Sequence, residues 1–186
     1  VLGLGVFVMQ FEKFTVKARE AIAESQRTAG RLGNPEIRPQ HLLIVLLTQD
    51  AGVVPNVLSV VGVNVDRLTQ EAAQLVEKLS KVSGTAQARL SNTFRQVLDA
   101  AETASRELGD SHIATEMFLL GLEAVDDKPQ GLLRGFGVTR ERLLQAIETV
   151  RGGRNVANED AEANYEALER YTRDMTCLLY TSDAAD

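Results

Sequence analysis

The chain has 186 residues, of which 44% are hydrophobic and 25% charged, a composition typical of a globular protein long enough to bury a core. The formal net charge is −6, and Lys and Arg are scattered among acidic residues, which argues against nucleic-acid binding. Aromatic residues make up only 5%, so an all-α fold with aliphatic packing is predicted. The single cysteine, Cys177, excludes an internal disulfide and favours a reducing, cytoplasmic location. No run approaches the roughly 20 apolar residues that a membrane span needs.

The two ends of the chain differ in character from the rest. VLGLGVFV, residues 1–8, precedes Met9 but lacks the basic region and cleavage site of a signal peptide. We therefore expect Met9 to be the natural start and residues 1–8 to be translated upstream sequence. CLLYTSDAAD, residues 177–186, breaks the helical pattern, and codons that encode it match a sequencing-library adaptor. We expect residues 177–186 to be an artefact that truncates a longer protein.

The middle of the chain contains an internal repeat. FTVKAREAIAESQRTAGRLGN, residues 14–34, aligns without a gap with LSNTFRQVLDAAETASRELGD, residues 90–110. The same register continues into the apolar segments that follow and, after one deletion, aligns GVNVDRL with GVTRERL. The repeat predicts two copies of one helical unit, residues 14–80 and 90–151, related by a pseudo-twofold axis.

Each unit is predicted to contain four helices. In the first unit, apolar residues recur at three- and four-residue spacing until Gly33, which can end a helix in the left-handed conformation. Pro39 suits the first turn of an almost wholly apolar helix, and Asn64 suits the N-cap of the fourth. The predicted helices cover residues 14–32, 39–49, 55–61 and 65–82 in the first unit, and residues 91–108, 115–124, 130–136 and 140–150 in the second.

The composition changes after residue 150. RGGRNVANEDAEA is rich in glycine, asparagine and acids, which predicts a flexible linker over residues 152–163. YEALERYTRDMT then resumes helical spacing. Residues 164–176 are predicted to form a short helix that begins a further domain.

The sequence contains no pattern typical of catalysis. GLLRGFGVTR lacks the Lys-Ser/Thr pair of a phosphate-binding loop, and His41 and His112 have no partner at metal-ligand spacing. Asp110 and Glu116 resemble an acid–base pair, but no nucleophile accompanies them, and the helix dipole accounts for a carboxylate at Glu116. We therefore predict no catalytic residue, no metal site and no cofactor for this chain.

The apolar faces allow two interpretations. Most of their Leu and Val residues are expected to form the core. Small or flexible side chains beside the seam between the units, those of Ala100, Ala104 and Met117, suit a groove that accepts varied apolar chains.

Several segments carry a resemblance to a known family. FTVKAREAI, GNPEIRPQHLL, GDSHIATEMFLL and the GVxxxRL pattern within each unit resemble the Clp amino-terminal repeat domain. RGGRNVANEDAEANYEALERYTRDMT resembles the segment that joins this domain to the first ATPase ring in the ClpB family of bacterial disaggregases, so the resemblance covers residues 9–176. It implies a domain that engages unfolded or aggregated polypeptide and passes it to the pore of a homohexameric machine that works with the DnaK system. ATP and Mg²⁺ are expected only for downstream domains of the parent protein.

The resemblance also implies binding residues. It assigns Thr15, Asp110 and Glu116 to a polar patch, and Ala100, Ala104 and Met117 to an apolar groove. Two groove positions are Ala where family members carry Leu, which bears on the depth and strength of the groove. Two alternatives remain, namely an adaptor-docking domain of a ClpA- or ClpC-type proteolytic unfoldase and a free-standing accessory protein with two Clp repeats.

Overall fold

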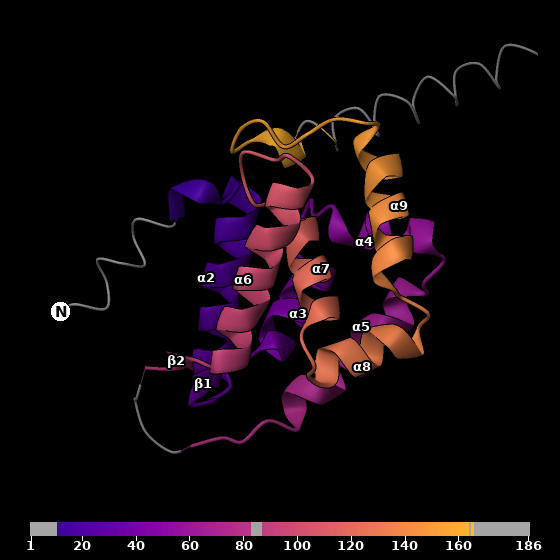
Figure 1. Ribbon diagram of the computed structural model, residues 1–186. Helices are drawn as coiled ribbons and strands as arrows, with labels where there is room; N and C mark the ends of the chain where they lie inside the picture. Colours follow the sequence, from indigo (N-terminus) through magenta and orange to yellow (C-terminus); the bar gives the residue numbers. More distant parts are fainter. Residues whose placement is uncertain (1–10, 83–86, 164, 166–186) are drawn as a thin grey trace, which may run out of the picture.

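The computed structural model describes residues 11–82, 87–163 and 165, and this part of the chain is mostly helical, as predicted (Figure 1). The first unit contains η1 (Phe11–Lys13), α2 (Val16–Arg31), β1 (Glu36–Ile37), α3 (Pro39–Thr48), α4 (Val54–Val61) and α5 (Val65–Glu77). The second contains β2 (Arg89–Leu90), α6 (Asn92–Glu107), α7 (Thr115–Ala124), α8 (Lys128–Gly135) and α9 (Arg140–Arg151). The predicted termini 1–8 and 177–186 lie outside the described residues, as does the predicted helix 164–176 apart from Tyr165. Within the described part, no helix is long and apolar enough to cross a bilayer.

The same local signals start corresponding helices in the two units. The hydroxyls of Thr15 and Ser91 accept a hydrogen bond from a backbone N–H in the first turns of α2 and α6. Asn64 and Thr139 cap α5 and α9 in the same manner. The largest difference from the predicted boundaries is in α5, which ends at Glu77 and not near residue 82. In addition, α2 begins at Val16 and not at residue 14, and α8 begins at Lys128 and not at residue 130.

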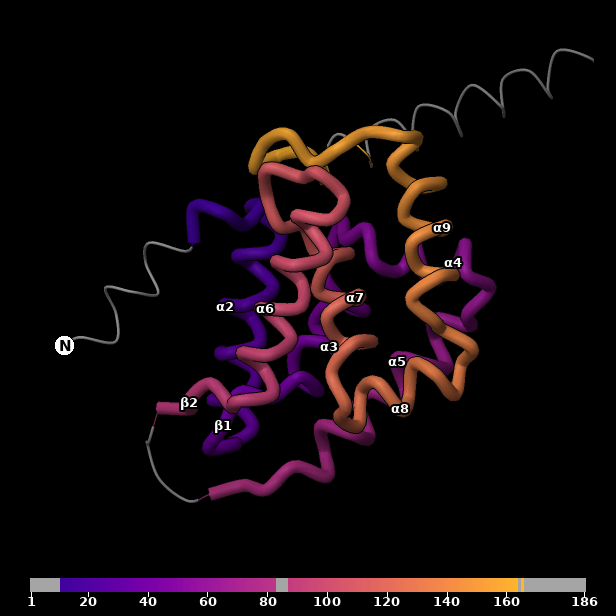
Figure 2. The backbone as a smooth tube through the Cα atoms, in the orientation of Figure 1, coloured from indigo at the N-terminus to yellow at the C-terminus, as the bar shows by residue number. Residues whose placement is uncertain are grey.

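Reciprocal backbone pairing ties the units together. β1 and β2 are parallel, with Ile37 opposite Leu90, and an isolated parallel bridge joins Phe14 to Ile113. Phe14 and Leu90 are equivalent in the repeat, as are Ile37 and Ile113, so each unit pairs its first segment with the loop of the other. Likewise α4 packs against α9, and α8 against α5 (Figure 2). This exchange is what a pseudo-twofold axis between the units requires.

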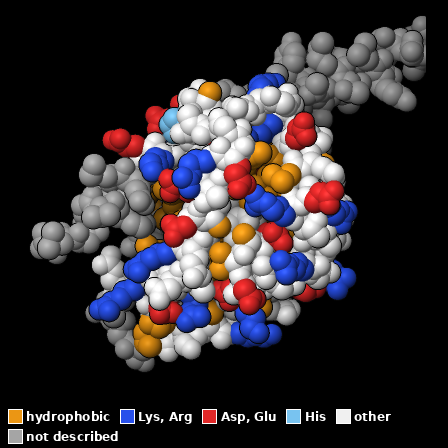
Figure 3. Space-filling model, in the orientation of Figure 1, with side chains coloured by type: hydrophobic (Ala, Val, Ile, Leu, Met, Phe, Trp, Pro, Cys, Tyr) orange, Lys and Arg blue, Asp and Glu red, His pale blue; other side chains and the backbone are white. Residues whose placement is uncertain are grey.

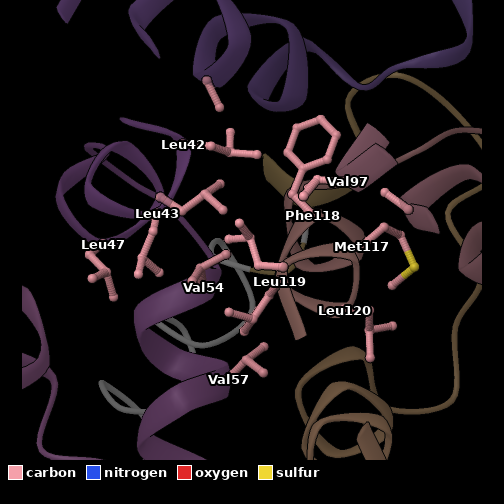
Figure 4. Close-up of a cluster of buried hydrophobic side chains, with 14 of the residues drawn as sticks. Leu42, Leu43, Leu47, Val54, Val57, Val97, Met117, Phe118, Leu119 and Leu120 are labelled. Atoms are coloured by element: carbon pink, nitrogen blue, oxygen red, sulfur yellow. The ribbon is translucent and has the colours of Figure 1, made fainter. Parts of the chain in front are cut away.

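The core lies around α3 and α7, the two central apolar helices (Figure 1). Leu42 and Leu43 of α3 and Phe118 and Leu119 of α7 are fully buried in one cluster (Figure 4). Burying such a side chain contributes about 1.5–3 kcal/mol each. Because α3 and α7 are apolar on nearly every side, the helices around them enclose both.

Candidate functional site

The predicted polar patch lies where the second unit's loop meets the start of the first helix. Thr15 is the N-cap of α2, and its N–H donates to the carbonyl oxygen of Ile113 at 3.0 Å. Asp110 follows the left-handed Gly109 at the end of α6, and Glu116 lies in the first turn of α7. The structure therefore brings Thr15, Asp110 and Glu116 to one end of the molecule.

Arg151, the last residue of α9, binds both carboxylates of this patch. Its Nη1 and Nη2 donate to Asp110 Oδ1 and Oδ2 at 3.0 and 2.9 Å, and its Nε donates to Glu116 Oε1 at 2.8 Å. The side chain of Arg151 is 5% exposed, and those of Asp110 and Glu116 are 0% and 1% exposed. The planar guanidinium suits this arrangement because it donates several hydrogen bonds in fixed directions.

The sequence pattern does not single out Arg151, because this residue lies at the end of the second unit. Its equivalent in the first unit is Val76, a buried residue of the apolar stripe of α5. The sequence nevertheless contains a signal for Arg151, because a charged residue stands where the first repeat has an apolar one. Such a substitution indicates a buried cation that needs a carboxylate partner.

The residues after α9 cover this end of the molecule. Residues 155–163 and 165, here called the docked segment, cross the loop before α7 toward the start of α2 (Figure 2). Val156 N–H donates to Asp110 Oδ1 at 2.9 Å, and the Val156 carbonyl accepts from the Ser111 N–H at 3.0 Å. Further along, Val16 N–H donates to the carbonyl oxygen of Glu159 at 2.9 Å.

Glu162 of the docked segment provides the cap that α7 lacks in its own sequence. Ala114 is the N-cap residue of α7 and has no side-chain acceptor. Glu162 Oε1 instead accepts from the Thr115 N–H at 2.7 Å and from the Thr115 hydroxyl, and Oε2 accepts from the Thr15 hydroxyl. A carboxylate here satisfies a free N–H and lies at the positive end of the helix dipole.

Apolar contacts complete the docking. Val156, Ala161 and Tyr165 form a small buried cluster with Ala114, separate from the main core. The prediction of a flexible linker over 152–163 differs from this arrangement. Only Val156, Ala161 and Glu162 of residues 152–163 are buried against the domain, and the others are exposed. Because most of these residues face solvent, the composition of the segment resembles that of a linker.

The ionisable groups of the site perturb one another. The pKa of Glu116 is raised from 4.5 to about 7, chiefly by burial and then by the negative charge of Glu162, while Arg151 opposes both effects. Burial alone would lower the pKa of Arg151, but the Glu116 and Asp110 carboxylates raise it above its ordinary value. Burial also raises the pKa of Tyr165. At this end, the guanidinium of Arg151 therefore binds two carboxylates, and Glu162 adds a third negative charge nearby.

The equivalent place in the first unit carries no such charges. Asn34 and Gln40 replace Asp110 and Glu116, and Asn34 Nδ2 donates to the Ser80 carbonyl at 2.9 Å. The Arg38 N–H donates to His41 Nδ1 at 2.9 Å, and Nε2 lies 3.0 Å from Asn34 Oδ1. Burial lowers the pKa of His41 to about 4, so the imidazole is a neutral structural group.

The predicted groove residues do not line an open groove. Ala104 and Met117 are 1% and 0% exposed, and Ala100 is half-buried. The physical reason is the close packing of α6 on α7, where small residues bring the backbones together. A Cβ atom on Gly121 would lie 2.4 Å from the carbonyl oxygen of Val97. On the face shown in Figure 3, hydrophobic side chains appear only in small patches among charged ones.

No group of three or more His, Cys, Asp or Glu in the described part of the chain could hold a metal ion. The carboxylates at the candidate site are bound instead by Arg151, by two threonine hydroxyls and by backbone N–H groups. This arrangement holds the docked segment against the starts of α2 and α7, so the site binds polypeptide.

The chain forms a domain of two helical repeats that are related by a pseudo-twofold axis and pack against each other. Residues 13–136 match the Clp repeat (R) N-terminal domain family. The chain belongs to this family. It is 36% identical over 169 residues to the chaperone protein ClpB of Rhodopirellula baltica, covering 91% of this chain and 19% of that protein. ClpB of Mycobacterium leprae is 36% identical over 163 residues, covering 87% of this chain and 19% of that protein. The chain thus spans about a fifth of the length of these curated relatives.

Solved structures show the same fold. The Hsp104 N-terminal domain from Candida albicans superposes with a TM-score of 0.70 at 20% identity, covering 81% of this chain and 99% of that one. The N-terminal domain of the caseinolytic protease associated chaperone ClpD from Arabidopsis thaliana superposes with a TM-score of 0.56 at 28% identity, covering 75% and 94%.

Proposed function

We propose that this chain is the substrate-binding and regulatory amino-terminal domain of an ATP-dependent protein disaggregase. It engages unfolded or aggregated polypeptide and helps deliver it to the threading pore of a cytoplasmic, homohexameric parent protein that works with the DnaK system. One observation carries the proposal: the similarity to ClpB covers 91% of the chain and therefore extends beyond residue 136, where the family match ends. The resemblance thus includes residues outside the repeat domain itself.

A neighbour in fold supports a role in binding polypeptide. The ClpV N-domain, solved in complex with VipB peptide, superposes on this chain with a TM-score of 0.60 at 23% identity. The fold can therefore receive a peptide. In this proposal the chain itself is no enzyme, and ATP and Mg²⁺ belong to the ATPase domains of the parent.

The contact surface in this proposal includes the exposed part of α6 around Ala100, which is half-buried. The side chains of Thr15, Asp110 and Glu116 are buried beneath the docked segment, so in this proposal they join the contact surface only when that segment is displaced. Apolar contacts around α6 would be weak, because the exposed hydrophobic patches are small (Figure 3). They would also tolerate salt, since screening acts on charges and not on apolar burial.

Fluorescence anisotropy with labelled α-casein, a permanently unfolded probe, tests the proposal. The full chain is expected to bind it with little change as salt rises from about 0.1 to about 0.5 M, a range over which exposed charge pairs are screened. Ala100→Glu places a charge in the contact surface and should weaken binding at least about tenfold, whereas Ala23→Glu, on the exposed face of α2, should not. Absence of binding, or an equal loss in both variants, contradicts the proposal.

A second candidate is the adaptor-docking domain of a proteolytic unfoldase. The observation behind it is the 28% identity to the N-terminal domain of the caseinolytic protease associated chaperone ClpD, which is lower than the 36% identity to ClpB. Genomic sequence past the codon for Thr176 separates the two. A long coiled-coil insertion after the first ATPase domain is expected for a disaggregase, and a protease-docking loop for the alternative. A stop codon would instead indicate a free-standing accessory protein.

A further inference from the structure

The docked segment is joined to α9 by a turn that isolates it from the helix. Gly152 and Gly153 follow α9 with φ values of 60° and 75°, in the left-handed region that glycine adopts without strain. Both glycines are exposed, and a Cβ atom on either would meet no other atom within 4 Å. The position of the segment therefore depends on its own contacts with the domain and not on a rigid continuation of α9.

The surface under the segment offers mainly hydrogen-bond donors. The N–H groups of Val16 and Ser111 bind carbonyl oxygens of the segment, and the N–H and hydroxyl of Thr115 and the hydroxyl of Thr15 bind the Glu162 carboxylate. These donors come from the start of α2 and from the loop and first turn of α7. Carbonyl oxygens occur in every polypeptide, so the feature that the surface selects is a carboxylate side chain.

The neighbours of that carboxylate define the rest of the ligand. Ala161 and Val156 are buried against Ala114, with 7% and 0% of their surface exposed, while Asp160 is exposed. Tyr165 belongs to the same cluster, so the site accommodates small apolar side chains and one aromatic ring beside the acid. The segment has the features of a peptide ligand, namely backbone acceptors, one buried anchoring carboxylate, a surface ion pair of Glu159 with Arg19, and apolar contacts.

The docking is also opposed by groups that it buries. Glu162 brings a third carboxylate to the two already bound by Arg151, and its charge disfavours ionised Glu116. Glu116 Oε2 and Tyr165 Oη are buried without a hydrogen-bond partner. A segment that is held by specific contacts but opposed by like charge and by unsatisfied polar atoms is suited to reversible binding.

We propose that the end of the domain formed by Thr15, Ala114 and Thr115 is a peptide-binding surface that the docked segment, residues 155–163 and 165, occupies. Release of this segment opens the surface to polypeptide bearing an acidic residue beside apolar ones. The inference rests on the proposed function for the source of that partner, an unfolded polypeptide. To the proposed function, this inference adds the chemistry of the segment that the surface binds. It also adds an internal competitor that controls whether other polypeptides reach the surface. Because the segment is tethered, it competes at a high effective concentration, and an outside peptide binds the intact chain weakly.

A labelled peptide of residues 154–165 tests the occupancy by fluorescence anisotropy with the full chain. Glu162→Ala removes the anchoring carboxylate from the tethered segment and leaves the surface unchanged. The variant chain should bind the wild-type peptide at least about fivefold more tightly than the wild-type chain does. Asp160→Ala, two residues away on the exposed side, should bind the peptide as the wild-type chain does. A peptide that itself carries Glu162→Ala should bind none of these chains.

A second variant guards against loss of folding. Ala161→Arg displaces the segment from its apolar contacts with Ala114 and should increase peptide binding in the same way. Circular dichroism confirms that each variant keeps its helical content. Equal peptide binding by wild type, Glu162→Ala and Ala161→Arg, or equal binding of both peptides, overturns the proposal.

Labelled α-casein separates this inference from the proposed function. If the surface serves substrate, Glu162→Ala and Ala161→Arg should bind α-casein more tightly than the wild-type chain does. Tighter peptide binding without any α-casein binding by any chain would leave the occupied surface established and refute the proposed function. α-Casein binding that is the same in all chains would support the function and refute the role of this surface in it.

Discussion

Replacing Glu116 by Gln separates the charge of this side chain from its shape. In the structure, Glu116 Oε1 accepts from Arg151 Nε at 2.8 Å, and Oε2 is buried without a partner. Gln keeps the acceptor and remains neutral at every pH. The variant therefore resembles the protonated form of Glu116, and also the first unit, where Gln40 occupies the equivalent position.

The magnitude follows from the pKa of Glu116, which burial and the charge of Glu162 raise from 4.5 to about 7. A raised pKa means that the folded protein binds this proton more tightly than the unfolded chain does. The stabilisation is complete below pH 4.5 and is lost as the pH rises through 7. At about 1.4 kcal/mol per pKa unit, the loss amounts to about 3 kcal/mol.

Urea denaturation of wild type and Glu116→Gln at a series of pH values measures this effect. The free energy of unfolding of the variant minus that of wild type should rise by about 3 kcal/mol between about pH 4 and pH 8, whatever constant offset the new amide introduces. Glu141→Gln, at the exposed start of α9, should stay within about 0.5 kcal/mol of wild type. A difference for Glu116→Gln that is flat or falls with pH refutes the account of this site.

Three further substitutions test other parts of the structure. Burial lowers the pKa of His41 from 6.5 to about 4, so the folded protein should lose about 3 kcal/mol of stability as the pH falls through this range. In urea titrations, His41→Gln should remove that loss. An unchanged pH profile would contradict the neutral imidazole. Gly121→Ala should lower the free energy of unfolding by about 1–3 kcal/mol because its Cβ would meet the Val97 carbonyl, whereas Gly131→Ala, exposed in α8, should raise it by up to about 1 kcal/mol in thermal melts. Arg151→Met should lower the free energy of unfolding by about 3–5 kcal/mol, because it leaves buried carboxylates without their cation. Arg140→Met removes a surface ion pair and should lower it by less than about 1 kcal/mol. Similar losses for both variants would show that Arg151 holds no buried network.

Repetition made the helices predictable from sequence. Thr15 and Ser91 precede apolar periodicity at equivalent positions, and Gly33 and Gly109 end the same helix in both units with φ values of 73° and 72°. Each boundary signal therefore occurred twice, and each copy supported the other. The reciprocal pairing of β1 with β2 was not predicted, because strands of two residues carry no alternating pattern.

The site was less predictable because its contacts join residues far apart in sequence. Glu162 acts on Thr15 and Thr115, and nothing in its own surroundings distinguishes it from the exposed acids Glu159 and Asp160. For Met117, apolar character is compatible with a core position or a groove position. Only the packing of α6 against α7 places it in the core.

Amide hydrogen exchange at Thr115, measured by NMR on the full chain, tests most directly whether the chain's own segment closes this site. Thr115 is the first residue of α7, where a backbone N–H has no partner within its own helix, and its N–H donates to Glu162. We predict slow exchange at Thr115 in the wild-type chain, much faster exchange in Glu162→Ala, and unchanged protection at Leu119 in the buried middle of α7. Fast exchange at Thr115 in the wild-type chain, or the same rate in both chains, would contradict the account.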